Sequence, residues 1–254
     1  MHWFYVEHSQ ITEETIRITG NDVNHIKNVL RMQRGENLII CDGNGKDYYC
    51  EIQDLSNDCV IAHILEINST ESELPAKIYL FQGLPKKDKM ELIIQKAVEL
   101  GVYQIIPVAM KRCVAKIEDK KKEQKKIERW QSIATSAAKQ SGRGIIPKIS
   151  TVMSYEEALK MAMELDYNLI PYEQAKGMLD SNKKIQEACT QKTIGIFIGP
   201  EGGFDDKEIE KAISTGFSTI SLGKRILRTE TAGLTTLSII MFQMELQKES
   251  GGNK

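Results

Sequence analysis

The chain has 254 residues, of which 41% are hydrophobic and 27% charged, with a formal net charge of −1. This composition is typical of a globular protein with one or two domains, and it excludes a disordered or fibrous chain. The most apolar late stretch, residues 234–242, is too short and too polar to span a bilayer. The first residues lack a basic segment followed by an apolar run, so no signal peptide is expected.

The cysteines and histidines are scattered along the sequence. Five cysteines, at positions 41, 50, 59, 113 and 189, form no Cys-x-x-Cys pair, and the four histidines do not cluster with them. An odd number of scattered cysteines favours free thiols in a reducing compartment. The sequence therefore predicts a cytoplasmic protein without a metal site or a disulfide framework.

Charge is distributed unevenly. Residues 1–70 hold 5 Lys/Arg and 11 Asp/Glu, a net charge of −6, whereas residues 71–150 hold 17 against 9, a net charge of +8. A basic middle segment is typical of a protein with an anionic partner on one face. The lysines of 120–126 alone would equally suit the solvated face of a helix.

The first 70 residues contain short β-rich runs separated by turn signals. The predicted strands cover residues 4–6, 37–41, 48–52 and 59–65. One helix interrupts them from Val23 to Met32, with Asp22 placed to cap it. The pattern predicts a small β-barrel or sandwich over residues 1–70, followed by a polar linker at 66–75.

From Ala76 onward, strands alternate with helices. The predicted strands are 77–81, 105–109, 167–170, 193–198 and 219–222. Four helices are predicted. The first begins with a capping box of Asp88 and Glu91, and the second is long and contains Trp130. The other two cover residues 206–216 and 229–247. This alternation predicts an α/β domain over residues 76–254, with a mostly parallel sheet covered by helices on both faces.

A glycine-rich segment, Ile198-Gly-Pro-Glu-Gly-Gly-Phe204, follows an apolar strand. Ligands of parallel sheets bind beyond the carboxyl ends of the strands, and glycines there leave backbone amides accessible. The segment lacks the lysine or the Gly-x-Gly-x-x-Gly spacing of phosphate-binding loops, and Glu201 would repel phosphate. It therefore favours a ligand with a base and a sugar but no phosphates, although a plain strand-to-helix turn capped by Asp205 or Asp206 would have the same pattern.

Two further irregular segments, residues 170–173 and 221–232, also follow predicted strands. Ser221 to Ala232 combines a strand end, two arginines and a helix start made of small residues. Two backbone-rich loops side by side would make a nucleoside pocket.

In combination, Ile198-Gly-Pro-Glu-Gly-Gly203 and Leu222-Gly-x-Arg-Ile-Leu-Arg-x-Glu-Thr-Ala232 resemble the signature of the RsmE family, the 16S rRNA (uracil-N3) methyltransferases of the SPOUT superfamily. Shorter matches extend over nearly the whole chain, among them His25-Ile-x-Asn-Val-Leu-Arg-Met32, Gly83-Leu-Pro-Lys86 and Gln140-Ser-x-Arg143. The order and spacing of these motifs together are highly specific.

The resemblance implies an RNA-binding, PUA-like β-barrel over residues 1–70 and a SPOUT domain with a C-terminal trefoil knot over residues 76–254. It implies a homodimer, S-adenosylmethionine as methyl donor, and 16S rRNA as substrate, either free or within the assembled 30S subunit, of which the resemblance favours the second. The donor-contacting positions that it implies are Ile170, Pro171, Ile198, Gly199, Pro200, Glu201, Gly202, Gly203, Ser221, Leu222, Gly223, Ile226, Leu227 and Arg228.

Basic residues are expected to serve the RNA, because the donor's sulfonium is itself cationic. The candidates for RNA contacts are Lys86, Lys89, Arg112 and Arg143. Arg228 is the candidate catalytic residue, expected to stabilise negative charge on the uracil when N3 loses its proton. Glu201 or Glu230 could instead act as a base, or merely cap or brace the backbone.

The sequence departs from the family pattern at a few positions. Trp3 stands where the family usually has arginine, and it could stack on a base or belong to the barrel core. Lys224 and Gly233 stand where the family often has proline. The charge of −6 also argues against a barrel that holds RNA by general electrostatics.

Three other functions remain open from the sequence. One is a SPOUT enzyme that acts on tRNA or on a ribose 2′-hydroxyl. Another is an RNA-binding protein without catalytic activity. A nucleotide-dependent enzyme is the third, and the missing lysine in the glycine-rich loop argues against it.

Overall fold

The computed structural model describes residues 2–114, 119–175 and 177–251, and the chain forms two compact units. Unit 1 consists of Met1–Glu73 with Ala138–Ile146, and unit 2 of Leu74–Ala137 with Pro147–Lys254. Residues 138–146 join unit 1 through Arg143, whose Nη2 lies 2.6 Å from Oε2 of Glu73. The backbone N–H groups of Gly144 and Ile145 also donate to Glu73.

Unit 1 is built on a five-stranded sheet in the order β1-β3-β4-β5-β2. Its strands are β1 (Trp3–Tyr5), β2 (Thr15–Thr19), β3 (Asn37–Cys41), β4 (Lys46–Leu55) and β5 (Cys59–Ser69). Register shifts after Tyr49 and Ile52 bend β4, so the sheet curls around an apolar core that includes Ile16, Leu38 and Ile52. The predicted β-rich N-terminal part is confirmed.

Some local predictions for unit 1 are wrong. The helix expected over 23–32 is a short α1 (Asn21–Asn24) followed by a π-helical turn, η2 (His25–Val29). Gly20, with a φ of 73°, precedes the helix in place of the expected cap Asp22. Strand β5 continues into the predicted linker as far as Ser69, because it pairs with β4 from Lys46 onward.

The N-terminal aromatic residues of β1 point in different directions. Phe4 packs in the core of unit 1, whereas the Trp3 side chain is 40% exposed. The aromatic residue of the core is therefore Phe4 and not Trp3, and stacking on a base stays a prediction for Trp3. The other short element of this region is the 3-10 helix η1 (His8–Gln10).

Unit 2 contains a seven-stranded sheet whose strand pairs are all parallel. The order is β12-β10-β11-β6-β7-β8, with β9 also paired to β7. The strands are β6 (Lys77–Gly83), β7 (Gln104–Ala109), β8 (Lys148–Ile149), β9 (Met153–Ser154), β10 (Tyr167–Pro171), β11 (Thr193–Ile198) and β12 (Ser218–Ile220). The predicted parallel sheet is confirmed.

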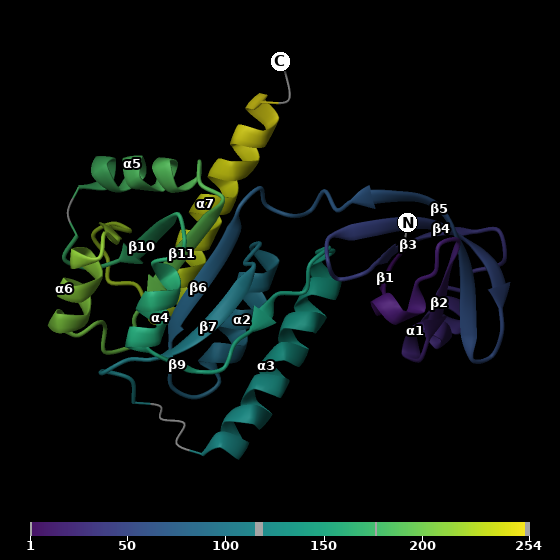
Figure 1. The fold of residues 1–254 in the computed structure, drawn as a ribbon, viewed down its shortest axis with the longest axis horizontal. Helices are drawn as coiled ribbons and strands as arrows, with labels where there is room; N and C mark the ends of the chain where they lie inside the picture. Colours follow the sequence, from purple (N-terminus) through teal and green to yellow (C-terminus); the bar gives the residue numbers. More distant parts are fainter. Residues whose placement is uncertain (1, 115–118, 176, 252–254) are drawn as a thin grey trace. The chain divides into compact units, whose positions relative to one another are not determined.

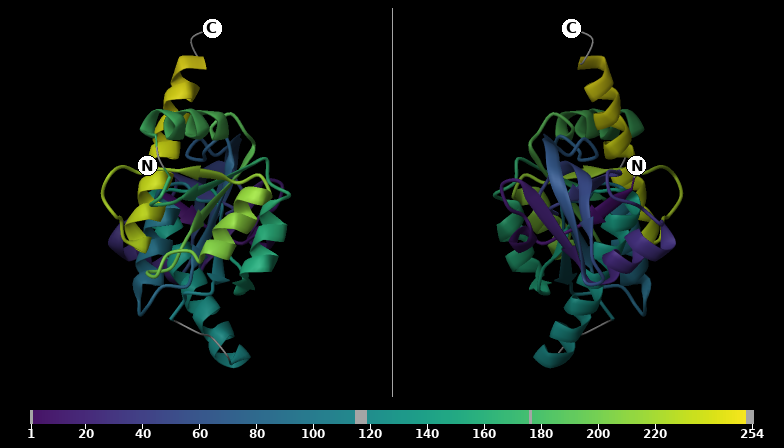
Figure 2. Two further views of the ribbon diagram at one scale, coloured as in Figure 1. Left: turned by 90° about the vertical axis from the view of Figure 1, so that its left-hand side faces the viewer. Right: turned by 90° about the vertical axis from the view of Figure 1, so that its right-hand side faces the viewer.

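Helices cover both faces of this sheet (Figures 1 and 2). Helices α4 (Tyr155–Ala162) and α6 (Asp206–Ser214) pack on one face against the stacked rings of Phe81 and Phe197. Helices α2 (Lys89–Glu99) and α7 (Thr229–Gly251) contact each other on the other face. The remaining helices are α3 (Lys120–Ser141) and α5 (Met178–Ala188).

Helix α2 shows how the pattern produces the packing. Its apolar positions lie at helical spacing and are buried, namely Met90, Ile93, Ile94, Ala97 and Val98. The predicted capping box is wrong, because the Asp88 side chain makes no capping hydrogen bond. The Glu91 carboxylate is instead held by the guanidinium of Arg129 on α3, at 2.8 Å.

Candidate functional site

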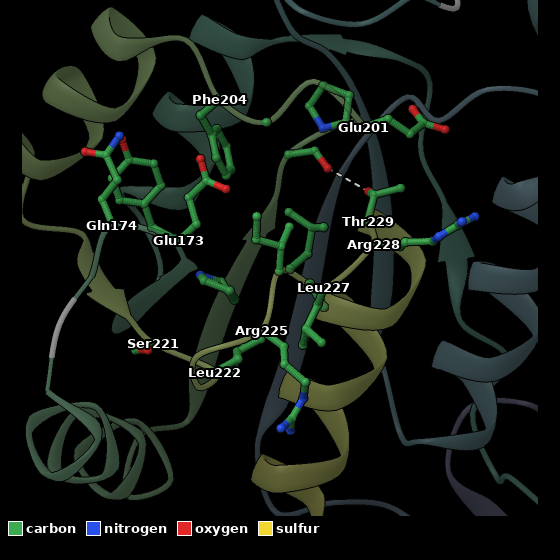
Figure 3. A pocket seen from close by; sticks show the side chains of 18 of the residues that line it. Glu173, Gln174, Glu201, Phe204, Ser221, Leu222, Arg225, Leu227, Arg228 and Thr229 are labelled. Carbon is green, nitrogen blue, oxygen red and sulfur yellow. Dashed lines mark hydrogen bonds between the residues drawn. The ribbon is translucent and has the colours of Figure 1, made fainter.

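A pocket of about 430 Å³ lies where strands β10, β11 and β12 end. It is bounded by the segment after β10, by the glycine-rich loop after β11, and by the segment that connects β12 to α7 (Figure 3). Because all these strands are parallel, their carboxyl ends meet at one edge of the sheet. The three segments that the sequence analysis placed at this edge therefore meet around one cavity.

The glycine-rich loop needs its glycines for close backbone packing. A Cβ on Gly199 would lie 3.1 Å from the Phe204 ring, and one on Gly202 would lie 3.1 Å from Cβ of Arg112. Gly203 has a φ of +68° and closes a turn by donating its N–H to the Pro200 carbonyl at 2.9 Å. The loop thus presents backbone groups, with few side chains, to the pocket.

The loop passes directly into helix α6. Asp205 is the N-cap, and it forms a reciprocal capping box with Glu208. The ammonium of Lys111 lies 2.9 Å from the Asp205 carboxylate and is the main cause that lowers the pKa of this group. The predicted helix cap is therefore Asp205, and the same helix start also contributes Asp206 to the pocket lining.

An ionic cluster joins the loop to helices α2 and α7. The ammonium of Lys89 lies 3.2 Å from Glu201 and 3.1 Å from Glu230, and the backbone N–H of Lys86 also donates to Glu201. Burial alone would raise the pKa of Glu201, but the N–H of Lys86 and the ammonium of Lys89 together lower it. The hydrogen bonds to Glu230 and then to Glu201 raise the pKa of Lys89. Glu201 is thus ionised and braced, which makes it a weak base.

The segment before α7 carries basic side chains at the mouth of the pocket. Gly223, with a φ of +110°, turns the chain, and its N–H donates to Oγ of Ser221. Arg225 and Arg228 line the pocket, are exposed, and extend away from one another (Figure 3). Thr229 is buried at the start of α7 and donates its hydroxyl to the Gly199 carbonyl at 2.6 Å.

Most predicted donor-contacting positions line the cavity. These are Pro171, Ile198, Gly199, Pro200, Glu201, Gly203, Ser221, Leu222, Gly223, Ile226, Leu227 and Arg228. Ile170 is fully buried in the core beneath the cavity, and Gly202 faces Arg112, so neither belongs to the lining. Two predicted RNA-contacting residues, Lys89 and Arg112, line the same cavity. The third, Lys86, is exposed, and the fourth, Arg143, lies buried in unit 1 against Glu73.

Several lining residues were not assigned from the sequence. They are Tyr172, Glu173, Gln174, Phe204, Asp206, Arg225, Thr229 and Ala232. Most belong to the edge segments already singled out, so their position after a strand was the available signal. Burial, with the nearby carboxylates of Asp206 and Glu173, raises the pKa of Tyr172, so its phenol stays protonated at neutral pH.

The chain matches two families by sequence. Residues 72–241 match the RNA methyltransferase domain family, and residues 18–65 match the RNA methyltransferase PUA domain family. The protein named ribosomal RNA small subunit methyltransferase E of Bacillus subtilis is 40% identical over 252 residues, which cover 97% of this chain and 98% of that protein. The protein of the same name from Mesomycoplasma hyopneumoniae is 38% identical, over 94% of this chain and 98% of its own length.

The chain belongs to the ribosomal RNA small subunit methyltransferase E family. A solved structure of this enzyme from Neisseria gonorrhoeae, bound to S-adenosyl methionine, is 34% identical with a TM-score of 0.78, over 95% of this chain and 97% of that one. A methyltransferase from Legionella pneumophila in complex with the same cofactor is 32% identical with a TM-score of 0.77, over 94% and 96%. The α/β fold with a parallel sheet and the PUA domain expected from the resemblance are confirmed, and the SPOUT assignment and the trefoil knot stay predictions.

Other kinds of site have no support in the part of the chain that the structure describes. Within residues 2–114, 119–175 and 177–251, no group of three His, Cys, Asp or Glu side chains is arranged to hold a metal ion. No described helix of this family member is long and apolar enough to cross a membrane.

Proposed function

We propose that this protein transfers a methyl group from S-adenosylmethionine to N3 of a uridine in the 16S rRNA of the small ribosomal subunit. The observation that carries the proposal is the cavity at the strand ends, formed by backbone-rich segments, whose glycine-rich loop lacks the lysine and the spacing of a phosphate-binding loop. Its relatives carry the name ribosomal RNA small subunit methyltransferase E, and one solved relative holds S-adenosyl methionine.

The residues present fit this donor. Ile198, Leu222 and Leu227 provide apolar surface for a purine, and the backbone of Gly199 to Gly203 can hydrogen-bond it. Glu173 and Asp206 add negative charge, which suits a cationic sulfonium. The bound donor would supply an electrophilic methyl carbon. At uridine N3 a bond to this carbon would form as the carbon–sulfur bond breaks, with the sulfur keeping that bond's electron pair and the N3 proton passing to solvent water.

The side chains must stabilise the negative charge that the uracil develops. Arg228 is exposed at the mouth of the cavity, where its guanidinium is free to meet a uracil oxygen, and we assign it this electrostatic role. The lowered pKa of Glu201 and the raised pKa of Tyr172 make neither group a ready base at neutral pH. We therefore propose that this chain contributes more by stabilising the uracil anion than by removing the N3 proton with a side-chain base.

The test of the reaction is single-turnover methylation of 30S particles and of free 16S rRNA, with the methylated base identified by mass spectrometry. Arg228→Ala is expected to lower the rate at saturating donor and RNA by about 10²-fold. Lys224→Ala is the matched control, because Lys224 is an exposed cation of the same segment that does not line the cavity. A wild-type rate in Arg228→Ala would refute the role, and methylation of tRNA or of a ribose hydroxyl would refute the substrate.

We also propose that two copies of this chain associate through α7. Phe242 and Leu246 are 59% and 43% exposed on this helix, one turn apart, and Ile239 lies half-buried beside them. Exposed apolar side chains in a row favour burial against a second copy. Analytical ultracentrifugation of Phe242→Glu should give a monomer where the wild type gives a dimer. A Phe242→Glu variant with the same mass in solution as the wild type would contradict this interface.

A further inference from the structure

A buried hydrogen-bond chain links the end of β6 to the start of α7 and to the glycine-rich loop of the cavity. Nε2 of Gln82, at the end of β6, donates to Oγ1 of Thr229 at 2.9 Å. Thr229, the first residue of α7, donates its hydroxyl to the Gly199 carbonyl at 2.6 Å (Figure 3). Gln82 is fully buried and Thr229 is 6% exposed, so bulk water does not compete for these bonds.

The direction of each bond in this chain is fixed. The Gln82 amide also donates to the Gly83 carbonyl at 3.0 Å, and a carbonyl can only accept, so the NH₂ group must face this side. The same NH₂ group then points its second hydrogen at the Thr229 hydroxyl. That hydroxyl must accept from Gln82, and its own single proton is left for Gly199.

Gln82 holds this position at an energetic cost. Its Oε1 has no hydrogen-bond partner among the described residues, and a buried acceptor without a partner is unfavourable. An apolar side chain of similar size would avoid that cost in the core. The amide donor therefore serves a purpose that packing alone does not require.

We propose that Thr229, oriented by Gln82, is a positioning residue that holds the donor loop and the start of α7 in their binding arrangement. Thr229 follows Arg228 in the sequence and its partner Gly199 opens the glycine-rich loop, so one hydroxyl ties the proposed catalytic arginine to the loop that receives the donor. The inference rests on the proposed function for its ligand. It deepens that function, because a loop already held in place loses less conformational freedom on binding.

The first test compares Thr229→Val with Thr229→Ser. Valine keeps the shape and removes the hydroxyl, whereas serine keeps the hydroxyl. Isothermal calorimetry with S-adenosylhomocysteine should show about tenfold weaker binding for Thr229→Val and nearly wild-type binding for Thr229→Ser. Equal affinities of the wild type and Thr229→Val would overturn the proposal.

Thr236→Val is the matched control for loss of stability. Thr236 is fully buried on the same helix, and its hydroxyl donates to the Ala232 carbonyl within α7, so this bond does not connect the helix to the donor loop. Its removal should lower the urea midpoint of unfolding without changing donor affinity. If Thr236→Val weakened binding as much as Thr229→Val, the effect would be general destabilisation and the positioning role would be wrong.

A measurement without donor separates this inference from the proposed function. Amide hydrogen exchange of residues 199 and 201–204 in the ligand-free protein should be about tenfold faster in Thr229→Val than in Thr229→Ser, because the loop loses its anchor. Gln82→Met should accelerate the same amides, and adding Thr229→Val to it should add little further effect. Equal exchange rates in Thr229→Val and Thr229→Ser would overturn the positioning role. Because this measurement needs no donor, its result does not depend on whether the wild-type protein binds S-adenosylmethionine.

Discussion

Gly83 is the residue at which β6 approaches the donor loop most closely. A Cβ at this position would lie 2.7 Å from the Pro200 nitrogen and 3.0 Å from Sδ of Met110. Gly83→Ala should therefore displace the loop and lower the free energy of unfolding by about 1–3 kcal/mol. Urea unfolding measures this cost, and calorimetry with S-adenosylhomocysteine should show weaker binding.

A second glycine provides the control for that substitution. Gly233 lies within α7, and a Cβ there would make ordinary contacts of 3.4 Å or more. Gly233→Ala should stabilise the protein by about 0.5–1 kcal/mol, because alanine loses less backbone entropy in a helix. A neutral Gly83→Ala would show that the loop can move away from β6 at no cost.

The pKa of Glu201 bears directly on whether this residue could act as the base. Its pKa is lowered, so it is ionised throughout the neutral range and binds a proton weakly. Glu201→Gln keeps an acceptor for the N–H of Lys86, and it should reduce the rate by less than about tenfold. The pH–rate profile between about pH 6 and 9 should keep its shape. Loss of the acidic limb in Glu201→Gln, but not in Glu230→Gln, would identify Glu201 as the base after all.

At the scale of helices and strands, the sequence predicts best where apolar runs are continuous. The bounds of β3 and β11 agree with the predicted 37–41 and 193–198, because a strand buried on both faces is apolar throughout. Helix α4 was not predicted, although Ser154 and Glu157 form a capping box before it. Its eight residues are too few for a clear helical period.

Long-range pairs decide what local patterns cannot predict. The pairing of Glu73 with Arg143 places residues 138–146 in unit 1, and the two residues are 70 positions apart. Gln82 and Thr229 are 147 positions apart. The loops of the candidate site were predictable because each follows a strand. The bonds that hold the loops against one another were not, since they depend on the folded topology.

The basic start of α3 is the element that we expect to contact RNA phosphates. Lys121, Lys122 and Lys125 are exposed on its first turns. The helix follows β7 in the chain, and Arg112, which lies between the two elements, lines the cavity. Replacing these three lysines by glutamine should weaken RNA binding and reduce the slope of log K against log salt by about 2–3.

Three other exposed lysines of unit 2 serve as the control for the α3 lysines. Lys160, Lys183 and Lys207 lie on α4, α5 and α6, and their triple replacement by glutamine removes the same charge. Filter binding with an rRNA fragment at several salt concentrations measures both slopes. Equal slopes of log K against log salt for the two triple variants would show that the α3 lysines affect RNA binding only through the net charge of the protein. Specific phosphate contacts by α3 would then be wrong.

Across the whole molecule, the two units should respond differently to acid. Among the described residues of unit 2, the structure lowers the pKa of Glu157, Asp166, Glu201 and Asp205. A lowered folded-state pKa means that the unfolded chain binds protons more readily than the folded chain. The stabilising contribution is therefore complete above the ordinary values of 4.5 and 3.8, and it is lost as the pH falls through the lower folded-state values.

The two tryptophans allow each unit to be followed separately, since Trp3 lies in unit 1 and Trp130 in unit 2. Trp3→Phe leaves only the reporter in unit 2, and Trp130→Phe leaves only the reporter in unit 1. Urea unfolding by fluorescence should show a midpoint for unit 2 that falls between about pH 5 and 3, with a smaller change for unit 1. Parallel declines of the two midpoints would mean that the two units unfold as one, and the expected difference between them would be wrong.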